Sequence, residues 1–125
     1  LGPRALRAEI ERAQHTIAGA TGVSPRFFRA PAGLRSPLLD PLLQRLGLRL
    51  ASWTRRGFDT VDQHPARVLG ALTRALGPGD ILLLHDGHAA RTSGGTAVVL
   101  EVLPRLLAAV RDAGLQPVTL RAALP

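Results

Sequence analysis

The chain has 125 residues and carries 16 basic side chains against 9 acidic ones, a formal net charge of +7 with histidines neutral. Cysteine is absent, which excludes disulfides, thiolate metal sites and cysteine nucleophiles. The hydrophobic share of 46% is normal for a globular domain, and no apolar run approaches the roughly 20 residues of a membrane span. The basic residues are all arginines without a dense run, and only 3% of residues are aromatic, which leaves little to stack on bases. The sequence therefore predicts one globular domain, or part of one, without nucleic-acid or membrane contact.

Helical and strand patterns alternate regularly along the chain. Apolar residues recur at helical spacing in four segments, and short apolar runs bounded by Gly and Pro lie between them. In chain order, the predicted elements are a helix over 3–20, a strand over 26–29, a helix over 37–46, a strand over 48–53, a helix over 65–76, a strand over 81–84, a helix over 96–113 and a strand over 116–120. Strands that alternate with helices pair in parallel through right-handed crossovers, which predicts an α/β fold.

A few residues mark the boundaries of these elements. Gly22 is a typical stop for the first helix. Ser36 is predicted to be the N-cap of the second helix, with Pro37 at its first helical position. The polar segment 55–64 is predicted to be a long loop, whereas the all-apolar run 81–84 is typical of a parallel strand covered on both faces.

Polar side chains follow three of the predicted strands. The first strand ends at Arg29, the second leads through Trp53 to a loop that contains Asp59, and the third stops at His85. Ligands of parallel α/β folds bind at the carboxyl ends of the strands. These strand ends would bring four groups to one edge of the sheet: an arginine, an indole, a carboxylate and an imidazole. Together they could form an acid–base site.

Each of these residues also has an ordinary structural interpretation. His85 could cap its strand with a hydrogen bond, Trp53 could be plain core, and Arg29 could be a surface arginine. His88 lies three residues after His85, but two histidines alone leave a zinc site short of ligands.

Three segments, in order, resemble the third, fourth and fifth motifs of the polysaccharide deacetylases, the family with the chitooligosaccharide-deacetylase homology domain. These segments are FRAPAG at 28–33, SWTRRGFDT at 52–60 and ILLLHDG at 81–87. The resemblance covers essentially the whole chain. It implies that 1–125 is the C-terminal half of a distorted (β/α) barrel, with the first and second motifs of the family expected before Leu1.

The resemblance implies an activity, a cofactor and a partner. The activity is metal-dependent hydrolysis of N-acetyl or O-acetyl groups from a carbohydrate, and the partner is the acetylated carbohydrate substrate. A divalent metal, usually zinc, polarises the acetyl carbonyl and its water in this family. Its ligands are expected before Leu1, so no metal ligand is assigned within the chain, and the isolated chain is expected to be inactive.

Roles for individual residues follow from the matching motifs. His85 would be the general acid that protonates the leaving group, Asp59 would hold and tune His85, and Arg29 would orient the catalytic base. Leu83 would line the pocket for the acetyl methyl group, Trp53 would wall the site, and backbone N–H groups near Ala32 could assist the oxyanion. The substrate-binding residues that the resemblance implies are therefore Trp53, Leu83 and Ala32.

The chain also departs from the pattern of the family. The fourth motif of the family usually carries two acidic residues followed by a tryptophan, and by spacing from Trp53 those places hold Arg56, Asp59 and Thr60. One carboxylate therefore remains. An aromatic residue usually stands where Ala32 sits, which suggests a more open sugar site.

Two alternatives stay open at this point. Arg55 and Arg56 could be no more than a solvated loop, or they could attract an anionic polysaccharide. The protein could hydrolyse acetyl groups, or it could be a catalytically inactive relative that only binds glycan or serves a structural role.

Overall fold

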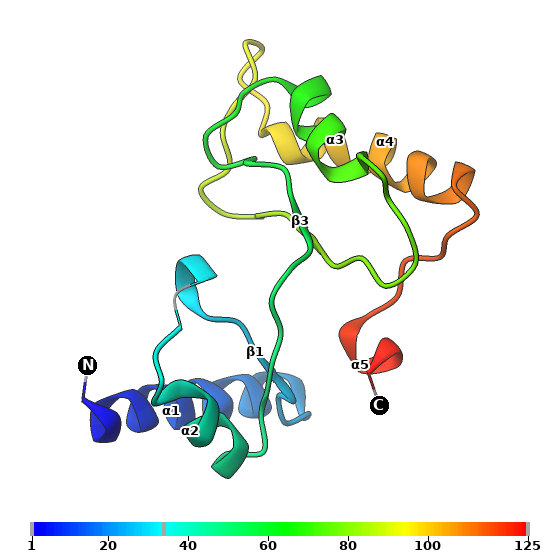
Figure 1. Ribbon diagram of the computed structural model, residues 1–125. Helices are drawn as coiled ribbons and strands as arrows, with labels where there is room; N and C mark the ends of the chain where they lie inside the picture. The colour runs from blue at the N-terminus through cyan, green and yellow to red at the C-terminus, as the bar shows by residue number, and fades with distance from the viewer. Residues whose placement is uncertain (1, 34, 125) are drawn as a thin grey trace. The chain divides into compact units, whose positions relative to one another are not determined.

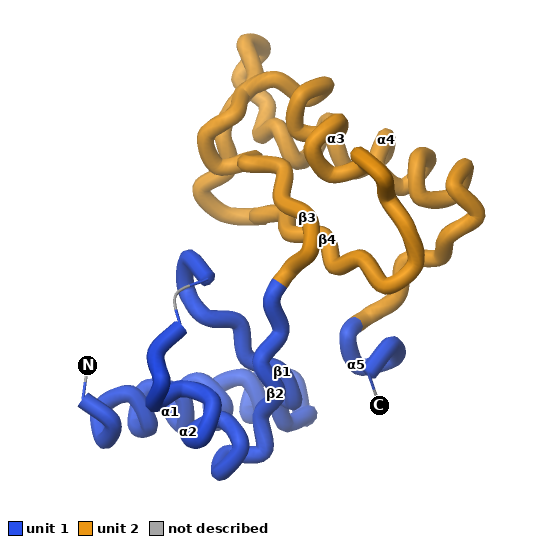
Figure 2. The backbone as a smooth tube through the Cα atoms, viewed as in Figure 1, with its two compact units in different colours: residues 1–52, 120–125 blue, residues 53–119 orange. Residues whose placement is uncertain are grey.

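The computed structural model describes residues 2–33 and 35–124, which form two compact units (Figure 2). Unit 1 contains residues 1–52 and 120–125, and unit 2 contains residues 53–119. Each unit combines helices with one pair of parallel strands. This confirms the predicted α/β class and the parallel pairing.

Figure 1 labels the five α-helices of the described residues with β1 and β3, and Figure 2 also labels β2 and β4. Unit 1 contains α1 (Pro3–Thr21), β1 (Phe27–Phe28), the 3-10 turn η1 (Pro31–Gly33), α2 (Leu39–Arg45), β2 (Arg49–Leu50) and α5 (Leu120–Ala123). Unit 2 contains β3 (Arg55–Arg56), α3 (Pro65–Thr73), β4 (Leu82–Leu83) and α4 (Val98–Asp112). β1 pairs with β2, and β3 pairs with β4.

Unit 1 is built on one face of α1. Helical spacing gives this helix a single buried position, Ile10, which packs with residues of α2 and with residues in and beside the strands. The buried core residues of the unit are Ile10, Ala30, Leu39, Leu43 and Leu48. Gly22 ends α1 as predicted: its φ is 73°, and its N–H donates to the carbonyl of Ala18 at 2.8 Å.

Unit 2 is built on the packing of α3 against α4. Val68 and Leu72 are four residues apart on α3, and the buried positions of α4 also recur every four residues, so each helix presents one apolar face. The buried core residues are Val68, Leu72, Val98, Val102, Leu106 and Val110. Leu82 of β4 and Leu84, which directly follows the strand, are partly buried and pack against this core, so they hold the strand against the two helices.

The predicted start of the second helix is wrong. α2 begins at Leu39, and Ser36 accepts the N–H of Leu39 through its backbone carbonyl at 3.0 Å instead of capping with its side chain. Pro41 gives the physical reason. In a helix that began at Pro37, Pro41 would clash with the carbonyl of Pro37, whereas in α2 it lies in the first turn, where proline is tolerated.

The sequence predicts a loop throughout the segment 55–64, but the first two residues of this segment form β3. Their parallel register with β4 is Arg55 with Leu82 and Arg56 with Leu83. Strand pairing uses backbone groups, so two consecutive arginines at the border of the unit are compatible with it. β3 therefore follows β2 without an intervening helix, which breaks the predicted alternation.

The last predicted strand, over 116–120, is also wrong. Residues 115–119 have no regular structure, and Leu120 begins α5. Pro117 has no N–H to donate to a ladder, and no strand of the described residues pairs with this segment. The other strands are two residues long and so shorter than predicted, and α3 ends at Thr73 instead of residue 76.

None of the helices in the described ranges has the length and apolar character needed to cross a membrane.

Candidate active site

A buried carboxylate and a half-exposed imidazole meet in unit 2. Asp59 follows β3 and His85 follows β4, so the parallel pairing of the two strands brings both residues to the same end of the pair. Nδ1 of His85 lies 2.9 Å from Oδ1 of Asp59. The side chain of Asp59 is 1% exposed and that of His85 is 42% exposed. The carboxylate is therefore the inner and the imidazole the outer member of the pair.

Two contacts to Asp59 fix the position of His85. The backbone N–H of His85 donates to Oδ2 of Asp59 at 2.7 Å, while the ring nitrogen Nδ1 faces the other oxygen. A carboxylate only accepts hydrogen bonds, so Nδ1 is the protonated nitrogen. Nε2 is then the nitrogen that remains for a substrate. Sequence reasoning selected both residues, and the structure brings them into contact.

Asp59 also holds the loop that follows His85. Its backbone carbonyl accepts the N–H of Ala90 at 2.8 Å. Within this loop His88 has a φ of 56°, and its side chain is exposed. The left-handed conformation is uncommon for a residue with a Cβ. The hydrogen bond from Ala90 to Asp59 fixes the end of this loop.

Gly57 is a structural part of the site that sequence reasoning missed. A Cβ at this position would lie 2.7 Å from Cγ1 of Val68 and 3.2 Å from Cδ1 of Leu72, so glycine lets the chain approach α3 closely. Asp59 follows two residues later and is 1% exposed. A glycine between β3 and the buried aspartate was the signal available in the sequence.

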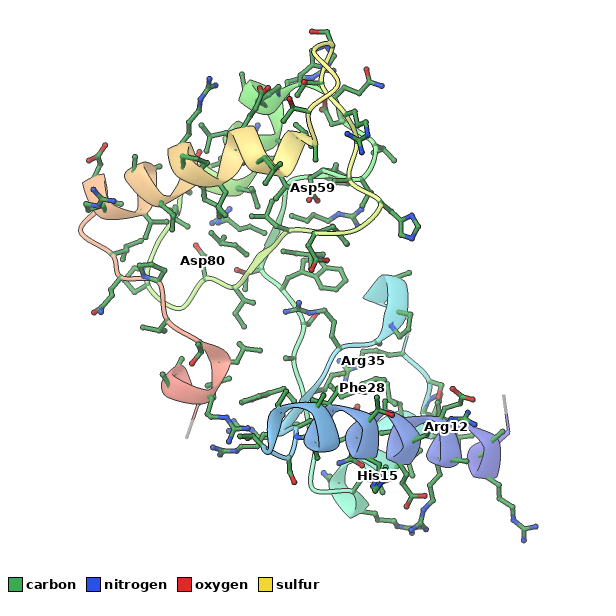
Figure 3. The ribbon with its side chains drawn as sticks, turned by 180° about the vertical axis from the view of Figure 1, so that it is seen from behind. Arg12, His15, Phe28, Arg35, Asp59 and Asp80 are labelled. Carbon is green, nitrogen blue, oxygen red and sulfur yellow. The ribbon has the colours of Figure 1, made fainter. Side chains whose placement is uncertain are left out.

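A second polar network lies at the opposite end of the two strands (Figure 3 labels Asp59 and Asp80). Asp80 accepts hydrogen bonds from the N–H of Gly77 at 2.9 Å, the hydroxyl of Thr54 at 2.7 Å and Nε of Arg55 at 3.0 Å. These partners, with the Gly77 N–H as the strongest, lower the pKa of Asp80 from 3.8 to about 2. Because this network precedes β4, it joins the two strands but lies away from His85.

The remaining predicted site residues lie in both units. Leu83 belongs to β4 and is half-buried two residues before His85, and Trp53, also half-buried, begins unit 2. Arg29 and Ala32 belong to unit 1 and are exposed. Nη2 of Arg29 donates to the carbonyl of Ser52 at 3.4 Å. Ala32 has a φ of 53° within η1.

Two further features of the described residues concern ligands. No group of three His, Asp or Glu side chains lies close enough together within 2–33 and 35–124 to hold a metal ion, so these residues do not fit a metal site by themselves. A hollow of about 420 Å³ lies near the N-terminal ends of α3 and α4, and Asp59 and His85 do not line it. It is lined by Gln63, His64, Pro65, Thr92, Ser93, Gly94 and Glu101.

Comparison with known proteins gives the family that the sequence motifs resemble. Residues 1–51 match the family model of the polysaccharide deacetylases. The chain is 35% identical over 103 residues to a chitooligosaccharide deacetylase of Azorhizobium caulinodans, a match that covers 74% of this chain and 48% of that protein. It is 29% identical over 91 residues to a bifunctional xylanase/xylan deacetylase of Cellvibrio japonicus, covering 73% of this chain and 14% of that protein.

A solved structure is also similar over most of the chain. The family 4 carbohydrate esterase from Streptomyces lividans, in complex with acetate, superposes with a TM-score of 0.83 at 29% identity. The match covers 95% of this chain and 57% of that one. The chain thus spans about half the length of the chitooligosaccharide deacetylase and of the esterase. It belongs to the polysaccharide deacetylase family, carbohydrate esterase family 4, and corresponds to part of its domain.

Proposed function

We propose that the full-length protein hydrolyses acetyl groups from an acetylated carbohydrate and that this chain supplies the general acid of the reaction. The contact between Asp59 and His85 is the observation that carries the proposal. In this proposal, residues 1–125 are the C-terminal half of a distorted (β/α) barrel and hold the third to fifth motifs of the family.

His85 would act through Nε2. Hydrolysis breaks the bond between the acetyl carbon and a sugar nitrogen or oxygen, and the departing atom needs a proton as the bond breaks. With Nδ1 directed at Asp59, a protonated His85 can release a proton only from Nε2. The backbone N–H and the ring of His85 both contact the buried carboxylate of Asp59, and these two contacts hold the ring in one orientation.

The other site residues have supporting roles in the proposal. Leu83 would line the pocket for the acetyl methyl group, and Trp53 would form a wall of the site. Arg29 would orient the catalytic base that deprotonates the attacking water, and backbone N–H groups near Ala32 would stabilise the oxyanion. The family typically uses a divalent metal, and we propose that its ligands lie in the first and second motifs. The described residues of this chain contain no group of three His, Asp or Glu side chains that could hold this metal.

The test is acetate release by the full-length protein from oligomers of N-acetylglucosamine and from acetylated xylan. We expect His85→Ala to reduce kcat by a factor of about 100 or more, the usual contribution of a general acid. His88→Ala is the matched control, because it removes an exposed imidazole three residues away, and it should change kcat by less than about twofold. A chelator should abolish activity, and added zinc should restore it.

A catalytically inactive glycan-binding relative is the second candidate, and one observation favours it. Arg56 and Thr60 stand where the fourth motif of the family carries an acidic residue and a tryptophan. If the wild-type protein releases no acetate from any of these substrates, with or without added zinc, this second function replaces the first.

A further inference from the structure

An arginine and an aromatic residue are stacked on the surface between β3 and the candidate acid–base pair. The guanidinium carbon of Arg56 lies 4.1 Å from the centroid of the Phe58 ring. Both residues are exposed, Phe58 to 47%. A guanidinium above an aromatic face is held by its attraction to the ring electrons, and its N–H edges still point outward.

This stacked pair lies beside the reacting end of the strands. Phe58 directly precedes Asp59 in the chain. Arg56 is in register with Leu83, two residues before His85, and residues paired in a sheet project from the same face. The guanidinium therefore lies on the side of the strand pair that carries Leu83.

The charge of Arg56 is available to a ligand, in contrast to that of its neighbour. Arg55 is ion-paired with Asp80 and also donates to the carbonyl of Ala75 at 2.9 Å. Within the described residues the side chain of Arg56 forms no ion pair, and its guanidinium is stacked on the ring of Phe58. The nearest carboxylate in the sequence, Asp59, is buried and occupied by His85. Asp86, the other carboxylate next to His85, is exposed and is not ion-paired with Arg56.

The backbone holds the ring of Phe58 in this exposed place. Phe58 has a φ of 58°, a left-handed conformation that is rare for an aromatic residue. Both neighbours of Phe58 are held in place, because Gly57 is packed against α3 and Asp59 is buried and in contact with His85. The ring is thus fixed at the surface, although burial would be favourable for it. This arrangement orients the guanidinium before any ligand arrives.

We propose that Arg56, positioned by Phe58, binds a carboxylate group of the carbohydrate substrate. The proposal rests on the proposed deacetylase function and narrows its substrate to an acetylated glycan that carries an acidic sugar. A planar guanidinium with two outward N–H groups binds a carboxylate through two parallel hydrogen bonds. The carboxylate could belong to a uronic acid or to the lactyl ether of a muramic acid, and both supply the same chemistry.

The experiment compares matched neutral and acidic substrates with the full-length protein. One pair is an N-acetylglucosamine tetramer and a tetramer of alternating N-acetylglucosamine and N-acetylmuramic acid. The second pair is acetylated xylan oligosaccharide without and with glucuronic acid. The variants are Arg56→Gln and Phe58→Leu, with Phe58→Tyr as a conservative replacement. Arg74→Gln is the control, because it removes an exposed charge elsewhere in unit 2. The readout is the ratio of KM for the acidic substrate to KM for the neutral one.

We expect the wild-type protein to favour the acidic member of at least one pair. Arg56→Gln should raise the KM ratio about fivefold, the size of an exposed to half-exposed ion pair, and the effect should shrink at high ionic strength. Phe58→Leu should raise the ratio by a smaller factor, because it releases the guanidinium, while Phe58→Tyr and Arg74→Gln should leave it at the wild-type value. The pair of substrates that responds identifies the source of the carboxylate.

Equal loss on acidic and neutral substrates in Arg56→Gln would overturn the proposal, as would an equal effect of Arg74→Gln. Absence of acetate release by the wild-type protein from all four substrates would instead reject the deacetylase function. In that case the same oligomers are titrated calorimetrically. Tighter binding of an acidic oligomer that is lost in Arg56→Gln would support the role of Arg56, and equal affinity for both members of each pair would reject it.

Discussion

Every acceptor group of Asp59 is used within unit 2. Its two carboxylate oxygens face the backbone and the ring of His85, and its carbonyl accepts the N–H of Ala90. An aspartate that is 1% exposed would be costly without such partners. The sequence could predict this residue because it lies in the loop after the predicted strand over 48–53 and in a segment that resembles a family motif. The sequence alone could not show that it binds the histidine through two separate atoms.

Replacement of Asp59 by Asn tests the role of the carboxylate. An amide can offer an N–H to Nδ1, which would favour the wrong tautomer of His85. We expect kcat for acetate release to fall by about 100-fold or more, since a comparable change in a serine protease triad has a still larger effect. Asp112→Asn, at the exposed end of α4, is the control and should leave kcat unchanged. Unchanged kcat in Asp59→Asn, measured on a protein with the wild-type circular dichroism spectrum, would contradict this role.

At the scale of elements, the short strands of unit 2 are held at both ends by side chains. Asp59 and His85 join the chain after β3 and β4, and the Asp80 network joins Thr54 and Arg55 to the start of β4. Sequence patterns predicted the presence of α1, α2, α3 and α4 because each has a regular apolar face, but they did not predict the short helix α5. They did not predict β3, because Arg55 and Arg56 have no apolar alternation and its pairing depends on backbone groups.

Close packing between Gly57 and α3 leads to a stability prediction. Gly57→Ala would place a methyl group 2.7 Å from Cγ1 of the buried Val68 side chain, so this packing must rearrange. We expect a loss of about 1–3 kcal/mol in the free energy of unfolding, as for other overpacked cores. Gly87→Ala, where an added Cβ meets nothing within 4 Å, should be neutral or slightly stabilising. Urea unfolding of both variants measures the difference, and similar values for the two would show that the approach to α3 is not tight.

The Asp80 network gives the strand pair a dependence on pH. The pKa of Asp80 is lowered from 3.8 to about 2, so its ionised form stabilises the folded state above pH 3.8. This stabilisation decreases as the pH falls from about 4 to about 2 and is absent below that range. Asp80→Asn should therefore reduce the difference in urea midpoint between pH 5 and pH 2.5. If the urea midpoint of Asp80→Asn changes between pH 5 and pH 2.5 as much as that of the wild type, other carboxylates cause the acid sensitivity.

On the scale of the whole molecule, the chain has two separate cores. One consists of residues of α1, α2 and the chain around β1 and β2, and the other of residues of α3 and α4. The family motifs in the sequence indicated the class of fold and the Asp59–His85 pair. They could not indicate the division into two units, because each helical face shows only that it is buried and not which partner buries it.

Separate cores predict separate responses to core substitutions. Leu72 is 0% exposed in unit 2, and Leu43 is 2% exposed in unit 1. Each change to Ala should cost about 2–5 kcal/mol in its own core. We expect hydrogen exchange to accelerate over 53–119 in Leu72→Ala and over 1–52 in Leu43→Ala. Uniform acceleration along the whole chain in both variants would show that the two cores unfold as one cooperative unit.

Asp59 binds both ends of the loop that follows His85, and this affects which substitutions and insertions the loop can accept. The loop begins at His85 and returns at Ala90, and Asp59 binds the chain at both points. Residues 86–89 can therefore be exchanged or lengthened while the imidazole stays in place. New sequence grafted into this loop is expected to alter the surface beside His85 and to leave the imidazole in place, because Asp59 binds the chain on both sides of the graft.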